Sequence, residues 1–149
     1  MIGVGHLGYH HARILRSLAS EVSVFDVREA RAAEVAAELG VRREASAAGL
    51  LSRVDAVVIA SNTVTHFDVA MEALAAGRHI LVEKPIASDS DHAARMASEA
   101  ESRGLVLAVG HVERFNPAVV AAGSAIRDPM FIEAHRLAPF KPRGTDVSV

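Results

Sequence analysis

The sequence of 149 residues contains no cysteine and no tryptophan, and aromatic side chains make up only 4% of it. A chain without cysteine forms neither disulfides nor thiolate metal sites, so we expect a reducing compartment such as the cytoplasm. No metal site is expected elsewhere in the sequence. No apolar run approaches the ~20 residues that a transmembrane helix needs, and the start lacks the basic and apolar segments of a signal peptide. We therefore expect a cytoplasmic protein with no membrane partner.

An excess of charge of one sign is also missing. The 16 basic and 18 acidic side chains give a formal net charge of -2, which predicts no general attraction to nucleic acid. Half of the residues are hydrophobic and 23% are charged, as is typical of a globular protein. The length is sufficient for one domain with a core, or for one domain and part of a second.

Short apolar segments alternate with segments of helical periodicity along most of the chain. Strands are expected over residues 21–26, 41–44, 55–60, 79–83 and 105–109. Helices are expected over residues 7–19, 28–39, 47–52, 65–76, 89–103 and 117–126. On the first of these helices one face can be shared by Leu7, Ile14, Leu15 and Leu18. The alternation predicts an α/β fold, a Rossmann-like doubly wound parallel sheet with helices on both faces.

Three glycines at the start of the first expected helix have the spacing of a dinucleotide-binding turn. In such a turn Gly3 makes the tight bend, Gly5 lets a diphosphate approach the backbone, and Gly8 permits close packing of helix on strand. The N–H groups at the helix start carry a partial positive charge that favours an anion. Only Met1 and Ile2 precede the turn, whereas strands usually have about five or six residues. We therefore expect that the strand is cut short and that residues before Met1 are missing.

Asp26 closes the next expected strand, about 20 residues after the turn, where an acidic residue binds the adenosine ribose hydroxyls. Its charge would repel a 2′-phosphate, so NAD is the expected cofactor. Arg28 follows two residues later and could accommodate that phosphate, which leaves NADP open. In the alternative interpretation, Asp26 only ends the strand and caps the helix that begins near Arg28.

A charged pair followed by proline, Glu83-Lys84-Pro85, ends another expected strand. Ligands bind outside the carboxyl ends of the strands in doubly wound sheets, and a lysine there can hold a substrate oxygen or take part in proton transfer. With the glycine turn, Asp26 and the segments SNTVTH at 61–66 and GHVERFNP at 110–117, the chain resembles the glucose–fructose oxidoreductase/inositol dehydrogenase/MocA (Gfo/Idh/MocA) family over essentially its whole length.

The resemblance implies an oxidoreductase that binds NAD(H) or NADP(H) in an N-terminal Rossmann domain. Such an enzyme transfers hydride between the carbinol of a sugar or cyclitol and the nicotinamide. Lys84 is then the catalytic residue beside the reacting carbon and also contacts the substrate. Glu83 is expected near the nicotinamide ribose, and Arg114 and Asn116 are expected at the edge of the substrate pocket.

The residues expected to bind the cofactor are Gly3, Gly5, His6, Leu7, Gly8, Asp26, Val27, Ser61, Asn62, Thr63, His66, Glu83 and Lys84. His66 has an alternative interpretation as a first-turn helix residue packed beside threonines. Within the family, the segments 110–117, 131–136 and 139–146 together are most similar to the UDP-N-acetylglucosamine 3-dehydrogenases. This similarity implies a nucleotide-sugar substrate that is oxidised at its 3-hydroxyl.

The same resemblance predicts a Rossmann domain over residues 1–115 and an incomplete α+β substrate and dimerisation domain over 116–149. Residues 130–137 are a candidate first strand of that second domain. The family has an aspartate and a histidine a few residues apart in the second domain, and no such pair follows Thr145. We therefore expect a fragment that binds the cofactor without turnover, and a homo-oligomer when the protein is full length.

Two other functions fit parts of the pattern. A non-catalytic dinucleotide-sensing module would need the glycine turn and Asp26 but no second domain. A methyltransferase that uses S-adenosylmethionine also has a glycine-rich turn and an acid after the second strand, but it does not need Glu83-Lys84-Pro85. His10 and His11 are expected to be exposed or packed on the first helix rather than to bind a metal.

Overall fold

The computed structural model describes residues 1–135 and residue 137. They divide into two compact units, of which the first is Met1–Gly110 and the second begins at His111. The predicted domain border after residue 115 stays a prediction. Within the described part of the chain, no helix combines the length and the apolar character that crossing a membrane requires.

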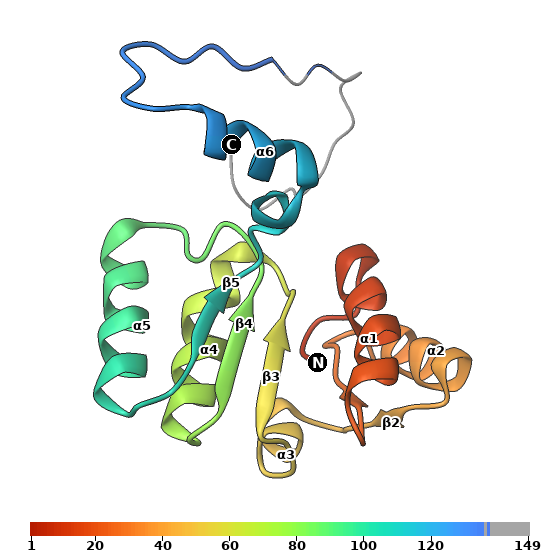
Figure 1. The fold of residues 1–149 in the computed structure, drawn as a ribbon. Coiled ribbons are helices and arrows are strands. Elements are labelled where there is room, and N and C mark those ends of the chain that lie inside the picture. The colour runs from red at the N-terminus through yellow and green to blue at the C-terminus, as the bar shows by residue number, and fades with distance from the viewer. Residues whose placement is uncertain (136, 138–149) are drawn as a thin grey trace. The chain divides into compact units, whose positions relative to one another are not determined.

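The first unit is built on a parallel sheet (Figure 1). Its strands are β1 (Ser23–Val24), β2 (Arg42–Arg43), β3 (Ala56–Ile59), β4 (His79–Val82) and β5 (Leu107–Val109). β1 pairs with β2, and β3, β4 and β5 pair in that order, every pair being parallel. Ile2 forms parallel bridges to Phe25 and to Ile59 and so joins the two groups. The resulting order, β2–β1–Ile2–β3–β4–β5, confirms the predicted doubly wound sheet.

The first strand is short, but it is paired on both sides. Ile2 N donates to Val58 O, and Ala60 N donates to Ile2 O, both at 2.9 Å. On the other side, Gly3 N donates to Phe25 O at 2.9 Å. These hydrogen bonds fix the glycine turn at the centre of the carboxyl edge of the sheet.

The helices of this unit are α1 (His6–Leu18), α2 (Glu29–Leu39), α3 (Ala47–Leu51), α4 (His66–Ala75) and α5 (Ser90–Ser102), and a 3-10 turn, η1 (Thr63–Thr65), precedes α4. Every one of these α-helices begins and ends within one residue of its expected range. After α2, α4 and α5 the chain turns back through Gly40, Gly77 and Gly104, whose φ angles of +63°, +73° and +65° are those of left-handed residues.

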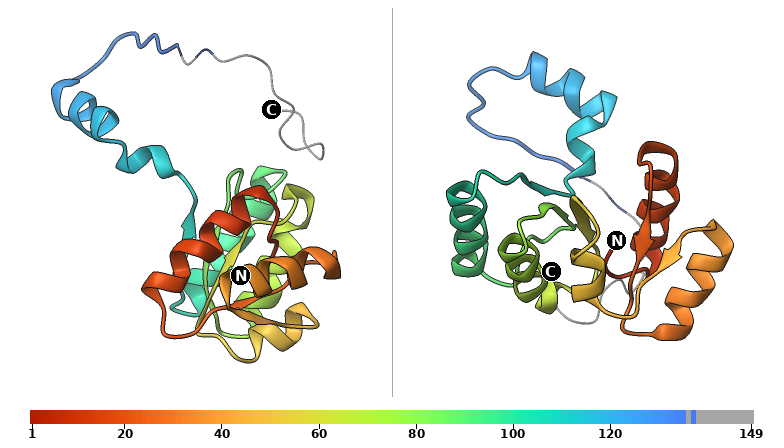
Figure 2. Two further views of the ribbon diagram at one scale, coloured as in Figure 1. Left: turned by 90° about the vertical axis from the view of Figure 1, so that its right-hand side faces the viewer. Right: turned by 90° about the horizontal axis from the view of Figure 1, so that it is seen from below.

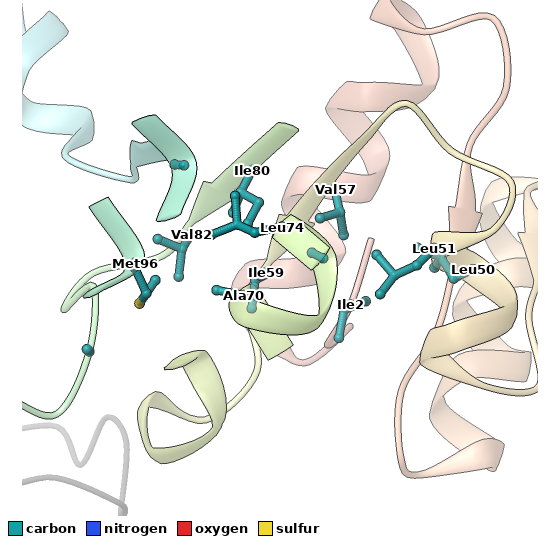
Figure 3. Packing of buried hydrophobic residues seen from close by; sticks show 13 residues of the cluster. Ile2, Leu50, Leu51, Val57, Ile59, Ala70, Leu74, Ile80, Val82 and Met96 are labelled. Atoms are coloured by element: carbon teal, nitrogen blue, oxygen red, sulfur yellow. The ribbon is translucent and has the colours of Figure 1, made fainter. Parts of the chain in front are cut away.

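The core lies on both faces of the sheet, because successive residues of a strand point to opposite sides. Val57 and Ile59 of β3 pack against Leu74 and other buried residues of α3, α4 and α5 (Figure 3). Val58 and Ala60, which alternate with them, pack against buried residues of α1 and α2. The two further views show these two groups of helices on opposite sides of the sheet (Figure 2).

Helix α1 approaches the sheet through its smallest residues. Gly8 and Ala12 are buried, and a Cβ atom on Gly8 would overlap the carbonyl oxygen of Gly3. No side chain has room at position 8. Of the residues expected to share one apolar face, Leu15 is partly buried. The others are exposed: Leu7, Ile14 and Leu18.

The described part of the second unit contains the 3-10 turn η2 (Val112–Phe115) and the helix α6 (Pro117–Ala125). The expectation of a strand over 130–137 is wrong for the residues described there, since 130–135 and 137 carry no strand. A strand needs a neighbouring strand for its backbone hydrogen bonds, and none of the described residues pairs with this segment. The segment 139–146, which carried part of the family resemblance, lies outside the described residues.

We expect Leu74→Ala to lower the free energy of unfolding by about 2–5 kcal/mol, because Leu74 is fully buried between α4 and the sheet. Urea unfolding followed by circular dichroism measures the change. The matched control is Leu18→Ala on α1, where the side chain is 75% exposed and the change should stay within about 0.5 kcal/mol. Equal losses in the two variants would contradict this packing.

Candidate cofactor site

The structure does not require glycine equally at the three positions of the turn. Gly3 has φ +81°, and a Cβ atom there would lie 2.6 Å from the backbone nitrogen of Ser61. Gly8 lies against Gly3, as described above. At Gly5, however, the nearest atom to an added Cβ is Nη2 of Arg28 at 3.7 Å, an ordinary contact distance. The packing of the chain therefore requires glycine at positions 3 and 8 but not at position 5, where the open space fits a ligand close to the backbone.

Gly5 is also the N-cap of α1, and no side chain caps this helix. No acidic side chain lies in its first turn either. The first N–H groups of a helix have no partner within the helix and carry a partial positive charge. The turn therefore offers a diphosphate both space over Gly5 and backbone donors at His6, Leu7 and Gly8, which is the combination that a dinucleotide needs.

Asp26 follows β1 and is only 6% exposed. Its Oδ2 accepts a hydrogen bond from Val4 N at 2.9 Å, and its Oδ1 accepts from Arg28 N at 2.9 Å and from Arg28 Nε at 3.2 Å. Burial acts to raise the pKa of Asp26, but the hydrogen bonds from the two backbone N–H groups and from the Arg28 guanidinium outweigh it and hold that pKa below its usual value. The carboxylate is therefore charged at neutral pH and ties the glycine turn to the end of β1.

Two arginines lie beside the same turn. The side chain of Arg28 is 65% exposed, and its guanidinium faces Gly5. Arg31 of α2 donates from Nε to Val4 O at 3.0 Å. Val27, between Asp26 and Arg28, is exposed. This end of the site thus combines a buried carboxylate with an exposed guanidinium, and both bear on the choice between NAD and NADP.

The segment after β3 lies directly against the turn, because Ser61 N would be only 2.6 Å from a Cβ atom on Gly3. Asn62 is exposed, and Thr63 is buried at the start of η1. Thr65 donates from Oγ1 to Ser61 Oγ at 2.8 Å. Ser61 and Asn62 are therefore placed at the carboxyl edge of the sheet, next to the glycine turn.

His66 begins α4 and is 1% exposed. Its Nδ1 lies 2.9 Å from Pro85 O, and its Nε2 lies 3.1 Å from Ser61 O. Both ring nitrogens thus face backbone carbonyls, so the ring connects the segment after β3 to the segment after β4. The peptide bond between Lys84 and Pro85 is cis.

Glu83, directly after β4, is buried between α1 and β5. Its Oε1 lies 2.7 Å from His11 Nε2, and its Oε2 accepts a hydrogen bond from Lys84 N at 3.1 Å. A Cβ atom on Gly110 would lie 2.8–2.9 Å from the Glu83 carboxylate, which therefore occupies the space that glycine leaves. The side chain of Lys84 is exposed, and within residues 1–135 no hydrogen bond or ion pair engages its ammonium group. That group is available to a ligand.

His11 is the site residue that the sequence did not reveal. It lies three residues after Gly8 on α1, which puts the two residues on the same face of the helix. That spacing is the signal that could have placed its side chain toward the sheet. The partner, Glu83, is 72 residues away in sequence, and no local pattern connects the two.

Arg114 and Asn116 belong to the second unit. Asn116 accepts from Ala118 N at 3.0 Å as the cap of α6, and its Nδ2 donates to Glu113 at 2.8 Å. Capping was one of the two roles that the sequence left open for this residue. The expected position of both side chains at the edge of a substrate pocket stays a prediction.

The glycine turn, the acid at the end of β1 and the strand order together define a dinucleotide-binding fold. The family described as an oxidoreductase family with an NAD-binding Rossmann fold matches residues 1–111. The chain belongs to the Gfo/Idh/MocA family. The resemblance drawn from the motifs is therefore confirmed.

A UDP-N-acetylglucosamine 3-dehydrogenase from Acidithiobacillus ferrooxidans is 47% identical over 150 residues, which are 100% of this chain and 48% of the relative. A scyllo-inositol 2-dehydrogenase (NAD(+)) from Bacillus subtilis is 33% identical over 128 residues, covering 82% of this chain and 37% of the relative. This chain of the Gfo/Idh/MocA family thus spans about half the length of the most similar of these curated relatives.

Solved structures agree with the same assignment. The UDP-N-acetylglucosamine 3-dehydrogenase of Acidithiobacillus ferrooxidans superposes with a TM-score of 0.80 at 47% identity, covering 83% of this chain and 41% of that one. GenD2 from gentamicin A biosynthesis, solved in complex with NAD, has a TM-score of 0.80 at 33% identity. The match covers 85% of this chain and 38% of the GenD2 chain. Both solved structures thus share this arrangement of sheet and helices over the part of the chain that they cover.

We expect His11→Ala to lower the free energy of unfolding by about 1–3 kcal/mol, because it leaves the buried Glu83 carboxylate without its partner on α1. Chemical unfolding of the wild type and the variant measures the loss. The matched control is His10→Ala, the neighbouring exposed histidine of the same helix, which should change stability by less than about 0.5 kcal/mol. A His11 variant as stable as the control would show that the contact contributes nothing.

Proposed function

We propose that this chain binds NAD(H) as the cofactor domain of a dehydrogenase that transfers hydride between the carbinol of a sugar and the nicotinamide. The observation that carries the proposal is Gly5, the one glycine of the turn whose place in the fold would accept a side chain. A close approach of a diphosphate to the backbone explains a glycine that packing does not require.

The cofactor residues predicted from the sequence can share one extended ligand. The diphosphate rests on residues 3–8, the adenosine ribose is held by Asp26 beside Val27, and the segment Ser61–Thr63 passes along the cofactor toward Glu83 near the nicotinamide ribose. His66 contributes to cofactor binding indirectly, because its ring connects the segment after β3 to the segment after β4. The support for this placement is the contact of the glycine turn with Asp26 on one side and with Ser61 on the other.

Nicotinamide supplies the hydride chemistry when it is bound. The task of this chain is to hold the reacting oxygen and to handle its proton. Lys84 fits that task, because its ammonium group is unengaged by the described residues and follows a strand end at the ligand edge of the sheet. In the oxidative direction Lys84 in its amine form takes the hydroxyl proton and, as the ammonium, then donates a hydrogen bond to the carbonyl oxygen, while the carbinol hydrogen leaves as hydride to the nicotinamide.

A nucleotide sugar, oxidised at a ring hydroxyl as by UDP-N-acetylglucosamine 3-dehydrogenase, is the substrate class that the 47% identity supports. Arg114 and Asn116 then border the substrate. We also place the protein in the cytoplasm, as its lack of cysteine favours, and expect the full-length protein to form a homo-oligomer.

Replacing Gly5 with valine should weaken NADH binding more than tenfold while leaving the fold intact, because the side chain would occupy the space over the backbone that the diphosphate needs. Fluorescence titration with NADH measures the affinity, and thermal unfolding verifies the fold. Gly123→Val, on an exposed face of α6 with no atom near an added Cβ, serves as the control and should bind like the wild type. Unchanged affinity in Gly5→Val would refute the dinucleotide site, and binding of S-adenosylmethionine instead of NADH would favour the methyltransferase alternative.

The same titration compares NADH with NADPH. We expect the wild type to prefer NADH, because the charged, buried Asp26 repels a 2′-phosphate. Arg28→Ala should weaken NADPH more than NADH, since it removes the exposed guanidinium beside the turn. Arg16→Ala, at the far end of α1, controls for the loss of one positive charge. A tenfold preference of the wild type for NADPH would overturn the role given to Asp26.

A further inference from the structure

The ring of His66 links the segment after β3 to the segment after β4. Its two nitrogens contact Ser61 O at 3.1 Å and Pro85 O at 2.9 Å, and it is 1% exposed. Ser61 also lies against Gly3, and Pro85 directly follows Lys84. The ring thus connects the glycine turn, through Ser61, to the lysine expected to meet the substrate, through Pro85.

Both partners of the ring are hydrogen-bond acceptors. A carbonyl oxygen accepts a hydrogen bond and cannot donate one, whereas a neutral imidazole has one N–H group and one bare nitrogen. The neutral ring can therefore bond only one of the two carbonyls, and the other faces a nitrogen lone pair. Protonated imidazole has two N–H groups, so only this form makes both hydrogen bonds.

His66 is the first residue of α4 and is 1% exposed, so its ring nitrogens face protein atoms rather than solvent. The titratable neighbours in the adjoining segments are Glu83 and Lys84 before Pro85 and Asp68 in the first turn of α4, and none of the ion pairs within residues 1–135 includes His66. Histidine is the side chain whose charge changes most readily between about pH 5 and 8.

We propose that His66 is a proton-dependent positioning residue of the cofactor site. Taking up a second proton completes the link between Ser61 and Pro85 and holds Lys84 and the glycine turn at a fixed separation. Losing that proton opens one of the two hydrogen bonds and lets the two segments move apart. The effect on NAD(H) rests on the proposed cofactor function, whereas the protonation of the ring does not.

Nitrogen-15 NMR of the histidine rings of the 149-residue chain tests the link without any ligand. From pH 5.5 to 8.5 we expect the two ring nitrogens of His66 to change from both protonated to one protonated, together with shifts of the Ser61 and Lys84 amide signals. A ring whose protonation stays the same over this range, in either form, overturns the proposal. So does a ring that titrates while those amide signals remain unchanged.

NADH titrations over the same pH range test the consequence for binding. The wild type should lose about fivefold in affinity as the ring loses its second proton, the size of effect expected from one hydrogen bond. His66→Gln offers two N–H donors on an amide that does not titrate, so its affinity should stay within about threefold of the wild type and lose the pH dependence. A His66→Gln variant that keeps the wild-type pH dependence overturns the proposal.

His66→Phe removes both donors and should bind NADH weakly at every pH. If that variant does not fold, His66→Gln still decides the question. The exposed His10→Gln is the matched control on α1 and should keep the pH dependence of the wild type. A chain that binds no NADH but shows the expected ring titration and amide shifts would refute the cofactor function while supporting the link. A chain that binds NADH but shows no such ring titration would refute the link through His66 while supporting the cofactor function.

Discussion

The close approach of α1 to the first strand is the constraint on which the rest of the site depends. Gly8 lies against the Gly3 carbonyl with no room for a Cβ atom, and this contact sets where the helix begins. The helix start then faces the carboxyl edge of the sheet, at its centre. The same approach brings His11 within 2.7 Å of Glu83, so one helix contributes both the backbone donors at one end of the site and a side-chain contact at the other.

The segments that follow the strands form a continuous series of contacts across this edge. Asp26 holds the glycine turn through Val4, the turn lies against Ser61, and His66 connects Ser61 to Pro85. Glu83 completes the series by filling the space beside Gly110. A dinucleotide is long enough to need several strand ends at once, and here each strand end is attached to the next. The site is therefore a property of the whole edge rather than of the glycine turn alone.

The sequence predicted the parts of this structure that depend on local patterns. Apolar runs located the strands, periodicity and the glycines at 40, 77 and 104 located the helices, and spacing identified Asp26. The partners of His11 and His66 could not be predicted, because Glu83 and Pro85 are far away in sequence and only the fold brings them close. The exposed side of α1 was missed for a related reason: periodicity finds the apolar residues, but the space beside Gly3 decides which face packs. The strand predicted over 130–137 is absent from the described residues 130–135 and 137, because a strand depends on a neighbouring strand to pair with.

Val4 has a consequence that reaches beyond the turn. Its N–H donates to Asp26, which follows β1, and its carbonyl accepts from Arg31 of α2. Both sides of this residue are therefore fixed. A loop that is already rigid before its ligand arrives loses little conformational entropy on binding, and more of the contact energy appears as affinity. Substitutions in α2 could therefore alter affinity purely through the flexibility of the loop, although α2 itself need never touch the ligand.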